Sequence, residues 1–72
     1  EVRVNSYAKV VDSVLMDGVD IGRYARVTKA IIDKDVRIPA SFVVGEDPEE
    51  DKRRFTMTPG GGVVIPRGTQ LD

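Results

Sequence analysis

The sequence predicts an all-β fold in which short parallel strands are coiled around one axis as a β-helix. The prediction rests on two observations: residues 1–45 repeat with a period of seventeen, and aliphatic residues recur about every six positions within each period. An amphipathic helix has a period near 3.6 and a half-buried strand has a period of about 2, so neither accounts for a step of six. A coil with three flat sides does, because each side contributes one aliphatic residue to the axis.

The repeat units begin at Val4, Ile21 and Ile38. Superposing the units shows which positions agree in residue type. The matching sets are Val4 with Ile21 and Ile38, Val10 with Val27 and Val44, Tyr7 with Tyr24, Ala8 with Ala25, and Val19 with Val36. A sandwich of unrelated short strands is the alternative, but a sandwich does not require a constant period. We therefore expect the axis to be filled by Val4, Val10, Ile21, Val27, Ile38 and Val44.

The other positions of the six-residue step have their own requirements. The second position holds Asn5, Gly22 and Pro39, where a small or turn-tolerant residue lets the chain round a corner. Met16 continues the step from Val10. Four residues after an axial residue a further small or apolar side chain is needed, and the sequence supplies Ala8, Val14, Ala25, Ile31 and Phe42. Each unit is one residue short of three full steps.

Length and composition limit the class of protein. The chain has 72 residues, eleven basic and twelve acidic side chains, and neither cysteine nor histidine. So short a chain has a small core, and without a disulfide or zinc site we expect it to depend on oligomerisation or a neighbouring domain. Its near-zero net charge argues against binding nucleic acid or an anionic membrane. The lack of cysteine and of a targeting or membrane-spanning segment fits a cytoplasmic protein.

The period also predicts where the coils end. It holds over residues 1–45, which make about two and a half coils, and it stops at a charged segment over 46–54 that a solenoid core cannot bury. Residues 55–72 are expected to cap the solenoid. Glu1 leads directly into a repeat, and a solenoid needs about three repeats and a cap at each end, so we expect the natural protein to continue upstream.

The tail carries local signals of its own. Asp47 is placed to cap a short helix that starts at Pro48, with acidic residues in its first turn and basic residues in its last. The carboxylates there also allow a metal site, but a solvated helical turn is the preferred interpretation. Residues 55–57 and 63–65 are predicted as two strands of a closing hairpin joined through Gly60–Gly62. The glycines also allow a phosphate cradle, although the lysine and serine spacing of a phosphate loop is missing.

The sequence offers no catalytic centre. Without histidine or cysteine, Ser6, Ser13 and Ser41 have no partner base within sequence reach. Tyr7 and Tyr24 take equivalent positions one coil apart, so they either stack on the surface, which we favour, or recognise a ligand. We expect the chain by itself to be catalytically silent.

Several segments of the chain follow one another at a recognisable spacing. They are Val14–Val19, Ala30–Lys34, Ile38–Pro39, Val44–Asp51, Arg53–Phe55 and Gly62–Gly68. Together they resemble the carboxy-terminal end of bacterial glucose-1-phosphate adenylyltransferases, also called ADP-glucose pyrophosphorylases. The most specific part is Gly-Glu-Asp-Pro-Glu-Glu-Asp over residues 45–51, followed by Arg-Arg-Phe. The resemblance covers essentially the whole chain and implies that the coil is left-handed.

The resemblance implies that the chain is a regulatory and oligomerisation segment of a larger enzyme. Such enzymes join ATP and glucose 1-phosphate, with magnesium, to give ADP-glucose and pyrophosphate for glycogen synthesis. The catalytic domain lies upstream, so no cofactor is expected in this chain. The solenoid would help to build a homotetramer and to bind a phosphorylated metabolite activator.

Lys34 and Arg67 match two basic positions of the family's regulatory cleft. A point charge and a guanidinium fork suit a phosphate, although two ordinary surface cations are the alternative. A fragment of a hexapeptide-repeat acyltransferase, or a solenoid binding module, is the alternative for the whole chain. Those acyltransferases use a histidine as general base, and this sequence has none.

Overall fold

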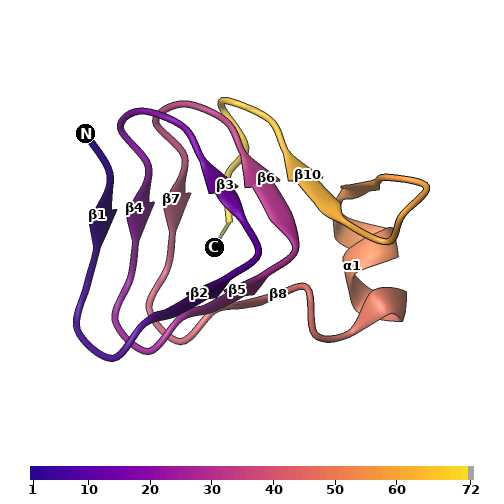
Figure 1. The fold of residues 1–72 in the computed structure, drawn as a ribbon, viewed down its shortest axis with the longest axis horizontal. Helices are drawn as coiled ribbons and strands as arrows, with labels where there is room; N and C mark the ends of the chain where they lie inside the picture. The colour runs from indigo at the N-terminus through magenta and orange to yellow at the C-terminus, as the bar shows by residue number, and fades with distance from the viewer. Residues whose placement is uncertain (72) are drawn as a thin grey trace.

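Short strands and one helix make up the computed structural model, which describes residues 1–71 (Figure 1). In chain order the elements are β1 (Arg3–Val4), β2 (Lys9–Val11), β3 (Val14–Leu15), β4 (Asp20–Ile21), β5 (Arg26–Thr28), β6 (Ala30–Ile32), β7 (Arg37–Ile38), β8 (Val43–Val44), α1 (Pro48–Arg54), β9 (Thr56–Met57) and β10 (Val63–Ile65). No helix in this part of the chain has both the length and the apolar character needed to cross a bilayer.

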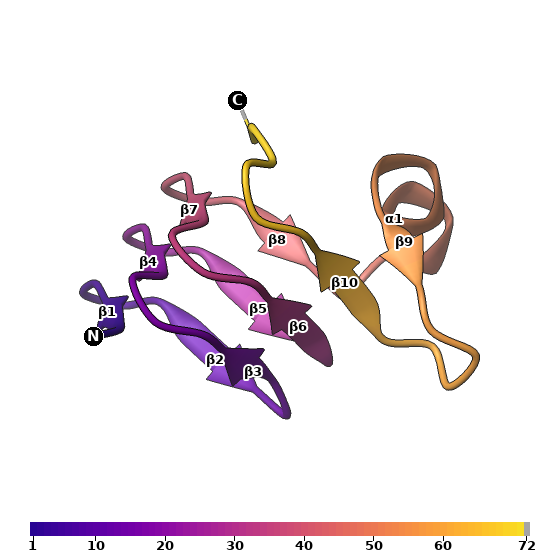
Figure 2. The same cartoon turned by 90° about the horizontal axis from the view of Figure 1, so that it is seen from above.

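The strands form three parallel sheets, each of which takes one strand from every turn of the chain. The orders are β1-β4-β7, β2-β5-β8 and β3-β6-β10, with β9 added to the last sheet beside β10. Figure 2 shows successive strands of each sheet side by side. Val4 lies opposite Ile21, which lies opposite Ile38, so the pairing register equals the predicted period. The expectation of parallel β structure is confirmed, and independent strands in a sandwich do not fit this register.

An apolar interior lies between the three sheets. Its fully or almost fully buried residues are Val19, Ile21, Ala25, Val27, Ala30, Ile32, Val36, Ile38, Val44, Val63 and Ile65. Four of the predicted axial residues, those in the second and third units, are therefore confirmed. Burying each valine or isoleucine side chain contributes about 1.5–3 kcal/mol, so this interior is the main stabilising feature of the fold.

The first coil differs from the prediction. Val4 was expected on the axis, but it is 49% exposed, and Val10 is only half-buried. Both pair with buried residues of the second coil, Ile21 and Val27. Within the described chain no strand pairs with the other edge of the first coil, so its axial positions lack a covering layer. The prediction that Val4 is buried is wrong. The period specifies that its side chain faces the axis, but not that a neighbouring strand covers it.

The third side of the coil is shifted by one residue from the prediction. Ile32 is buried and its partner Leu15 is half-buried, whereas Met16 is exposed. Val14 and Ile31 point outward, with exposures of 56% and 40%. The period is seventeen rather than eighteen because the step from the second to the third side is five residues.

The corners also differ from the expected ones. At the corner after the first side, positive φ occurs at Tyr7, Tyr24 and Ser41, at 64°, 62° and 63°, and not at the second position of the step. Gly22 is required for a different reason. A Cβ atom there would lie 2.6 Å from the backbone nitrogen of Ala40, so the small residue permits close approach of the next coil.

The charged segment forms the predicted short helix, α1. Asp47 caps it, and its side chain accepts hydrogen bonds from the backbone N–H groups of Glu49 and Glu50. Pro48 occupies the first turn as expected. The expectation that the whole segment is solvated is wrong for Asp51, which is only 3% exposed.

Asp51 ties the helix to the end of the coils. Its Oδ2 accepts a hydrogen bond of 3.0 Å from the backbone N–H of Gly45. Burial raises the pKa of this carboxyl above its ordinary 3.8, and the hydrogen bond from Gly45 partly opposes that rise. Gly45 has φ of 89°, and a Cβ atom there would lie 1.8 Å from the carbonyl oxygen of Thr28. The chain therefore leaves the coils through a conformation that only glycine fits.

After the helix the chain returns to the coils. β9 and β10 form an antiparallel hairpin, with Val63 opposite Met57. β10 then continues the third sheet in parallel beside β6, with Val63 opposite Ala30 and Ile65 opposite Ile32. After the excursion from β8 to β9, β10 therefore follows β3 and β6 in the third sheet.

Candidate regulatory anion site

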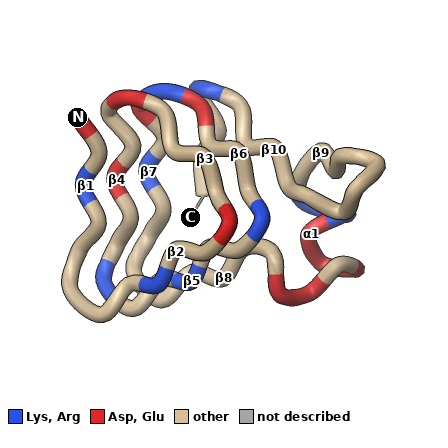
Figure 3. Tube along the Cα trace, viewed as in Figure 1, with Lys and Arg blue, Asp and Glu red and all other residues tan. Residues whose placement is uncertain are grey.

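The two basic residues that the sequence singled out lie at the corner after the third side. Ile32 and Ile65 are register partners, and the backbone N–H of Asp33 donates a 3.0 Å hydrogen bond to the carbonyl oxygen of Ile65. Lys34 and Arg67 each lie two residues beyond this pair, so they take equivalent positions in the turns that follow β6 and β10. Figure 3 shows basic and acidic segments mixed along this edge.

The two cations have different surroundings. Lys34 is exposed, and within residues 1–71 no carboxylate lies within ion-pair distance of its ammonium group. Arg67 is 68% exposed, and its Nη2 lies 3.5 Å from Oδ2 of Asp35. Asp33 forms no ion pair with either cation in the described part of the chain, and its Oδ1 accepts a hydrogen bond from the backbone N–H of Lys34. Among residues 1–71, therefore, Lys34 has no ion-pair partner and Arg67 has a loosely held one.

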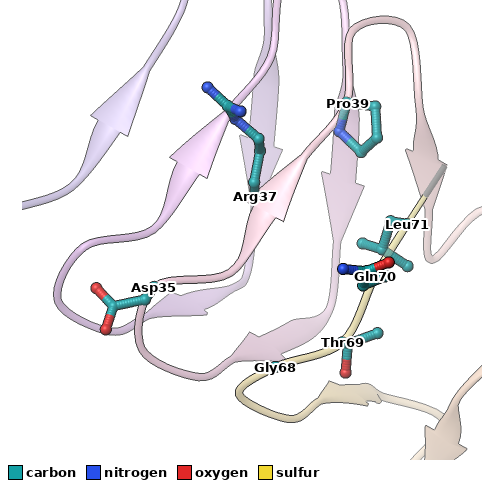
Figure 4. Close-up of a pocket in the computed structure, with 7 residues that line it drawn as sticks. All are labelled: Asp35, Arg37, Pro39, Gly68, Thr69, Gln70 and Leu71. Carbon is teal, nitrogen blue, oxygen red and sulfur yellow. The ribbon is translucent and has the colours of Figure 1, made fainter.

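A groove begins beside this corner. It has a volume of about 390 Å³ and is lined by Asp35, Arg37 and Pro39 on one side and by residues 68–71 on the other. Figure 4 shows the side chains of Arg37 and Pro39 on one wall and the tail residues on the other. Arg37 is exposed and lines the groove, whereas Lys34 and Arg67 are not among its lining residues. This arrangement suits an anion with an attached polar group.

Asp35 and Arg37 were not predicted as site residues. Arg37 had a weak signal, because Arg3, Asp20 and Arg37 share one position of the repeat and pair in register on the first sheet. The contact of Asp35 with Arg67 had none, because the two residues become neighbours only when β10 joins β6.

The remaining sequence features have structural roles. Tyr7 and Tyr24 stack as favoured, with ring centroids 5.0 Å apart and planes 9° apart. The glycine run forms a turn around Thr58. The N–H of Gly62 donates to Oγ1 of Thr58, and the N–H of Gly61 donates to the carbonyl oxygen of Thr58. Ser13 bridges two coils by donating to the carbonyl of Val11 and accepting from the N–H of Ala30.

The carboxylates of the charged segment are used in separate contacts. Glu46 pairs with Arg26 at 3.0 Å, and Glu50 pairs with Arg54 at 3.0 Å and also with Arg53. Over residues 1–71 no three acidic side chains come together in the geometry of a metal site. The helical turn is the interpretation that these contacts support.

Comparison with known proteins gives matches along the whole chain. A family model described as GlmU-like, C-terminal hexapeptide matches residues 1–65. The chain is 46% identical to the glucose-1-phosphate adenylyltransferase of Anaeromyxobacter sp. over 72 residues, which are 100% of the chain and 18% of that protein. Proteins of the same name from Bifidobacterium adolescentis and Bifidobacterium longum are 51% and 53% identical, over 99% of the chain and 17% of their length.

The chain thus spans less than a fifth of the curated relatives that it matches. The repeat that carries its parallel sheets falls inside the region that the family model covers. The chain therefore belongs to the GlmU-like, C-terminal hexapeptide family.

Proposed function

We propose that this chain is the regulatory and assembly segment of a glucose-1-phosphate adenylyltransferase, wound as a left-handed parallel β-helix. Identity near 50% to proteins of that name over the whole chain supports the proposal. In such an enzyme the chemistry with ATP and magnesium belongs to an upstream catalytic domain. Residues 1–45 would form the coils, 46–54 the excursion and 55–72 the cap.

The observation that carries the regulatory role is the equivalent placement of Lys34 and Arg67 in the turns that follow β6 and β10. A phosphate between them would receive charge-assisted hydrogen bonds from an ammonium and from a planar guanidinium fork. The rest of a phosphorylated metabolite would lie in the groove, toward Arg37. The groove is open and polar, which suits reversible binding of a metabolite better than permanent retention of a cofactor.

The tail connects this site to the interior of the segment. Residues 68–71 form one wall of the groove, and Leu71 also packs against the apolar interior beside Phe42 and Phe55. A ligand that holds the tail in place would stabilise both the wall of the groove and the contact of Leu71 with the interior. Regulation of a distant active site requires such a differential interaction with two states of the protein.

The exposed apolar surface supports an assembly role. Val14, Ile31 and Val64 lie in register on the outer face of the third sheet, and the first two are exposed. Strands β1, β2 and β3 also leave hydrogen-bonding groups at the edge of the first coil, as edge strands do. We propose that the catalytic domain of the same protein and further copies in a homotetramer cover these surfaces.

The test is activation of the full-length protein by sugar phosphates, with Lys34→Ala, Arg67→Ala and the double variant. Each single change should weaken activator binding by about 1.5–3 kcal/mol, the range for hydrogen bonds to charged groups. That loss corresponds to a roughly tenfold to hundredfold higher half-activation concentration. Basal turnover should barely change, because the catalytic groups belong to another domain.

Lys52→Ala is the matched control, because Lys52 is an exposed lysine on α1, away from the corner. Arg67→Lys should restore only part of the response, since the charge remains and the fork is lost. Half-activation concentrations equal to those of the Lys52 variant in both single variants would remove the two residues from the site. Strictly additive losses in the double variant would mean that they do not share one phosphate.

A further inference from the structure

Asp35 is an acidic residue that forms an ion pair with Arg67 of the proposed anion site. Its Oδ2 lies 3.5 Å from Nη2 of Arg67. Both side chains are more than 60% exposed, so water can replace either partner. The pair is therefore weak enough to exchange with a dissolved anion, since exposed ion pairs are typically worth about 0.2–1 kcal/mol.

The backbone around Asp35 makes its side chain unusual. Asp35 has φ of 60°, and the equivalent corners of the flanking coils are occupied by Gly18 and Gly68, with φ of 80° and 85°. Glycine adopts this conformation without steric cost, whereas a residue with a Cβ atom does so at some cost. Asp35 therefore adopts a backbone conformation that glycine would adopt with less strain, and it places a carboxylate at this corner.

Gly18 also makes room for this carboxylate. A Cβ atom on Gly18 would lie 2.1 Å from Oδ1 of Asp35, so only glycine at position 18 leaves that oxygen its place. One carboxylate oxygen thus lies over the preceding coil while the other faces Arg67. In this arrangement the Asp35 carboxylate lies between Gly18 and the guanidinium of Arg67.

The neighbouring carboxylate does not have the same relation to the cations. Oδ1 of Asp33 accepts the backbone N–H of Lys34, and no ion pair joins Asp33 to Arg67 among the residues described. An incoming anion that engages Arg67 through two N–H groups must therefore share the guanidinium with Asp35 or displace it.

We infer that Asp35 is an internal counter-ion of the anion site, which holds Arg67 in the free protein and competes with the bound anion for its guanidinium. This inference rests on the proposed function, because it assumes that an anion binds at Arg67. Asp35 then raises the dissociation constant of the site for its anion. Removing its charge, while keeping its shape, should make the site bind anions more tightly.

The experiment is calorimetric titration of inorganic phosphate into the full-length protein that carries this chain, at constant ionic strength. The part of the binding that disappears in Arg67→Ala defines this site and separates it from phosphate bound elsewhere. Asp35→Asn keeps the side-chain shape, and asparagine tolerates positive φ. We expect its dissociation constant to be lower than that of the unaltered protein by a factor of roughly 1.4 to 5, the factor implied by an exposed ion pair.

Asp33→Asn is the matched control, since it removes the same charge two residues away and retains an oxygen for the N–H of Lys34. It should change the dissociation constant by less than the Asp35 variant does, and Asp35→Asn should have no effect in an Arg67→Ala background. Equal tightening by both asparagine variants would show a general charge effect and overturn the inference. Weaker binding by Asp35→Asn would overturn it too, because Asp35 would then support Arg67.

A different result would separate the two proposals. If Arg67→Ala does not reduce phosphate binding by the full-length protein, the anion site itself is absent. The proposed role of Asp35 is then overturned as well. If the unaltered protein binds phosphate through Arg67 but Asp35→Asn binds it equally well, only the inference about Asp35 is overturned.

Discussion

The coils and the tail of this chain are stabilised in different ways. Between β4 and β8 the structure repeats one solution, in which an aliphatic residue on each side fills a common interior. Between Gly45 and β10 it uses single contacts that occur once, such as the cap from Asp47 and the hydrogen bond from Gly45 to Asp51. The coils therefore depend on volume and apolar burial, and the tail depends on individual polar partners.

The largest expected effect lies in the interior of the coils. Val27→Asp places a charge in a fully buried position with no partner, and we expect a loss of more than about 4 kcal/mol in the free energy of unfolding. Val11→Asp is the control, because Val11 is on the outward side of the neighbouring strand. Chemical denaturation of the full-length protein followed by circular dichroism measures both. Similar losses in the two variants would mean that the interior is not what stabilises the coils.

A smaller effect tests how closely the coils approach. Gly22→Ala would bring a Cβ atom within 2.7 Å of three backbone atoms of the next coil, which have little freedom to move. We expect a loss of about 3 kcal/mol, the upper part of the range for overpacking. Gly60→Ala in the tail has no atom within 4 Å of the new Cβ and should change little. The difference in denaturation midpoint between the two variants is the measurement, and equal midpoints would contradict the close approach.

The smallest of the three effects concerns Asp51, the one buried carboxylate among residues 1–71. Asp51→Ala leaves the N–H of Gly45 without its partner and should cost about 1–3 kcal/mol. Asp51→Asn keeps an acceptor and avoids burying a charge, so it should be close to neutral at pH 7. A loss for Asn as large as for Ala would mean that the charge, and not the hydrogen bond, holds the tail.

The same carboxylate predicts a pH dependence. Because burial raises the pKa of Asp51 in the folded protein, the unfolded chain loses this proton first, from pH 3.8 upward. In that window the folded state binds more protons, so the contribution of Asp51 to stability falls as the pH rises. Denaturation of the protein at several pH values should therefore show a slope that Asp51→Asn reduces. An unchanged slope would contradict the raised pKa.

The predictable parts of the molecule are those governed by neighbours along the chain or by the period. The period determined the parallel register and the burial of Ile21, Val27, Ile38 and Val44. Local chemistry determined the helix that Asp47 caps. The shift of the third side was not predicted, because the period fixes the length of a unit and not the side on which the short step falls.

The candidate site shows the same division. The resemblance singled out Lys34 and Arg67, but the repeat alone would place position 51, and not 67, one unit beyond Lys34. Only the return of β10 beside β6 makes Arg67 a neighbour of Lys34 and of Asp35. That return depends on hydrogen bonds between Ala30–Ile32 and Val63–Ile65 and on burial of Val63 and Ile65, residues far apart in the sequence. The sequence by itself determined the coils because their contacts repeat, and the tertiary structure decided the site because its contacts occur once.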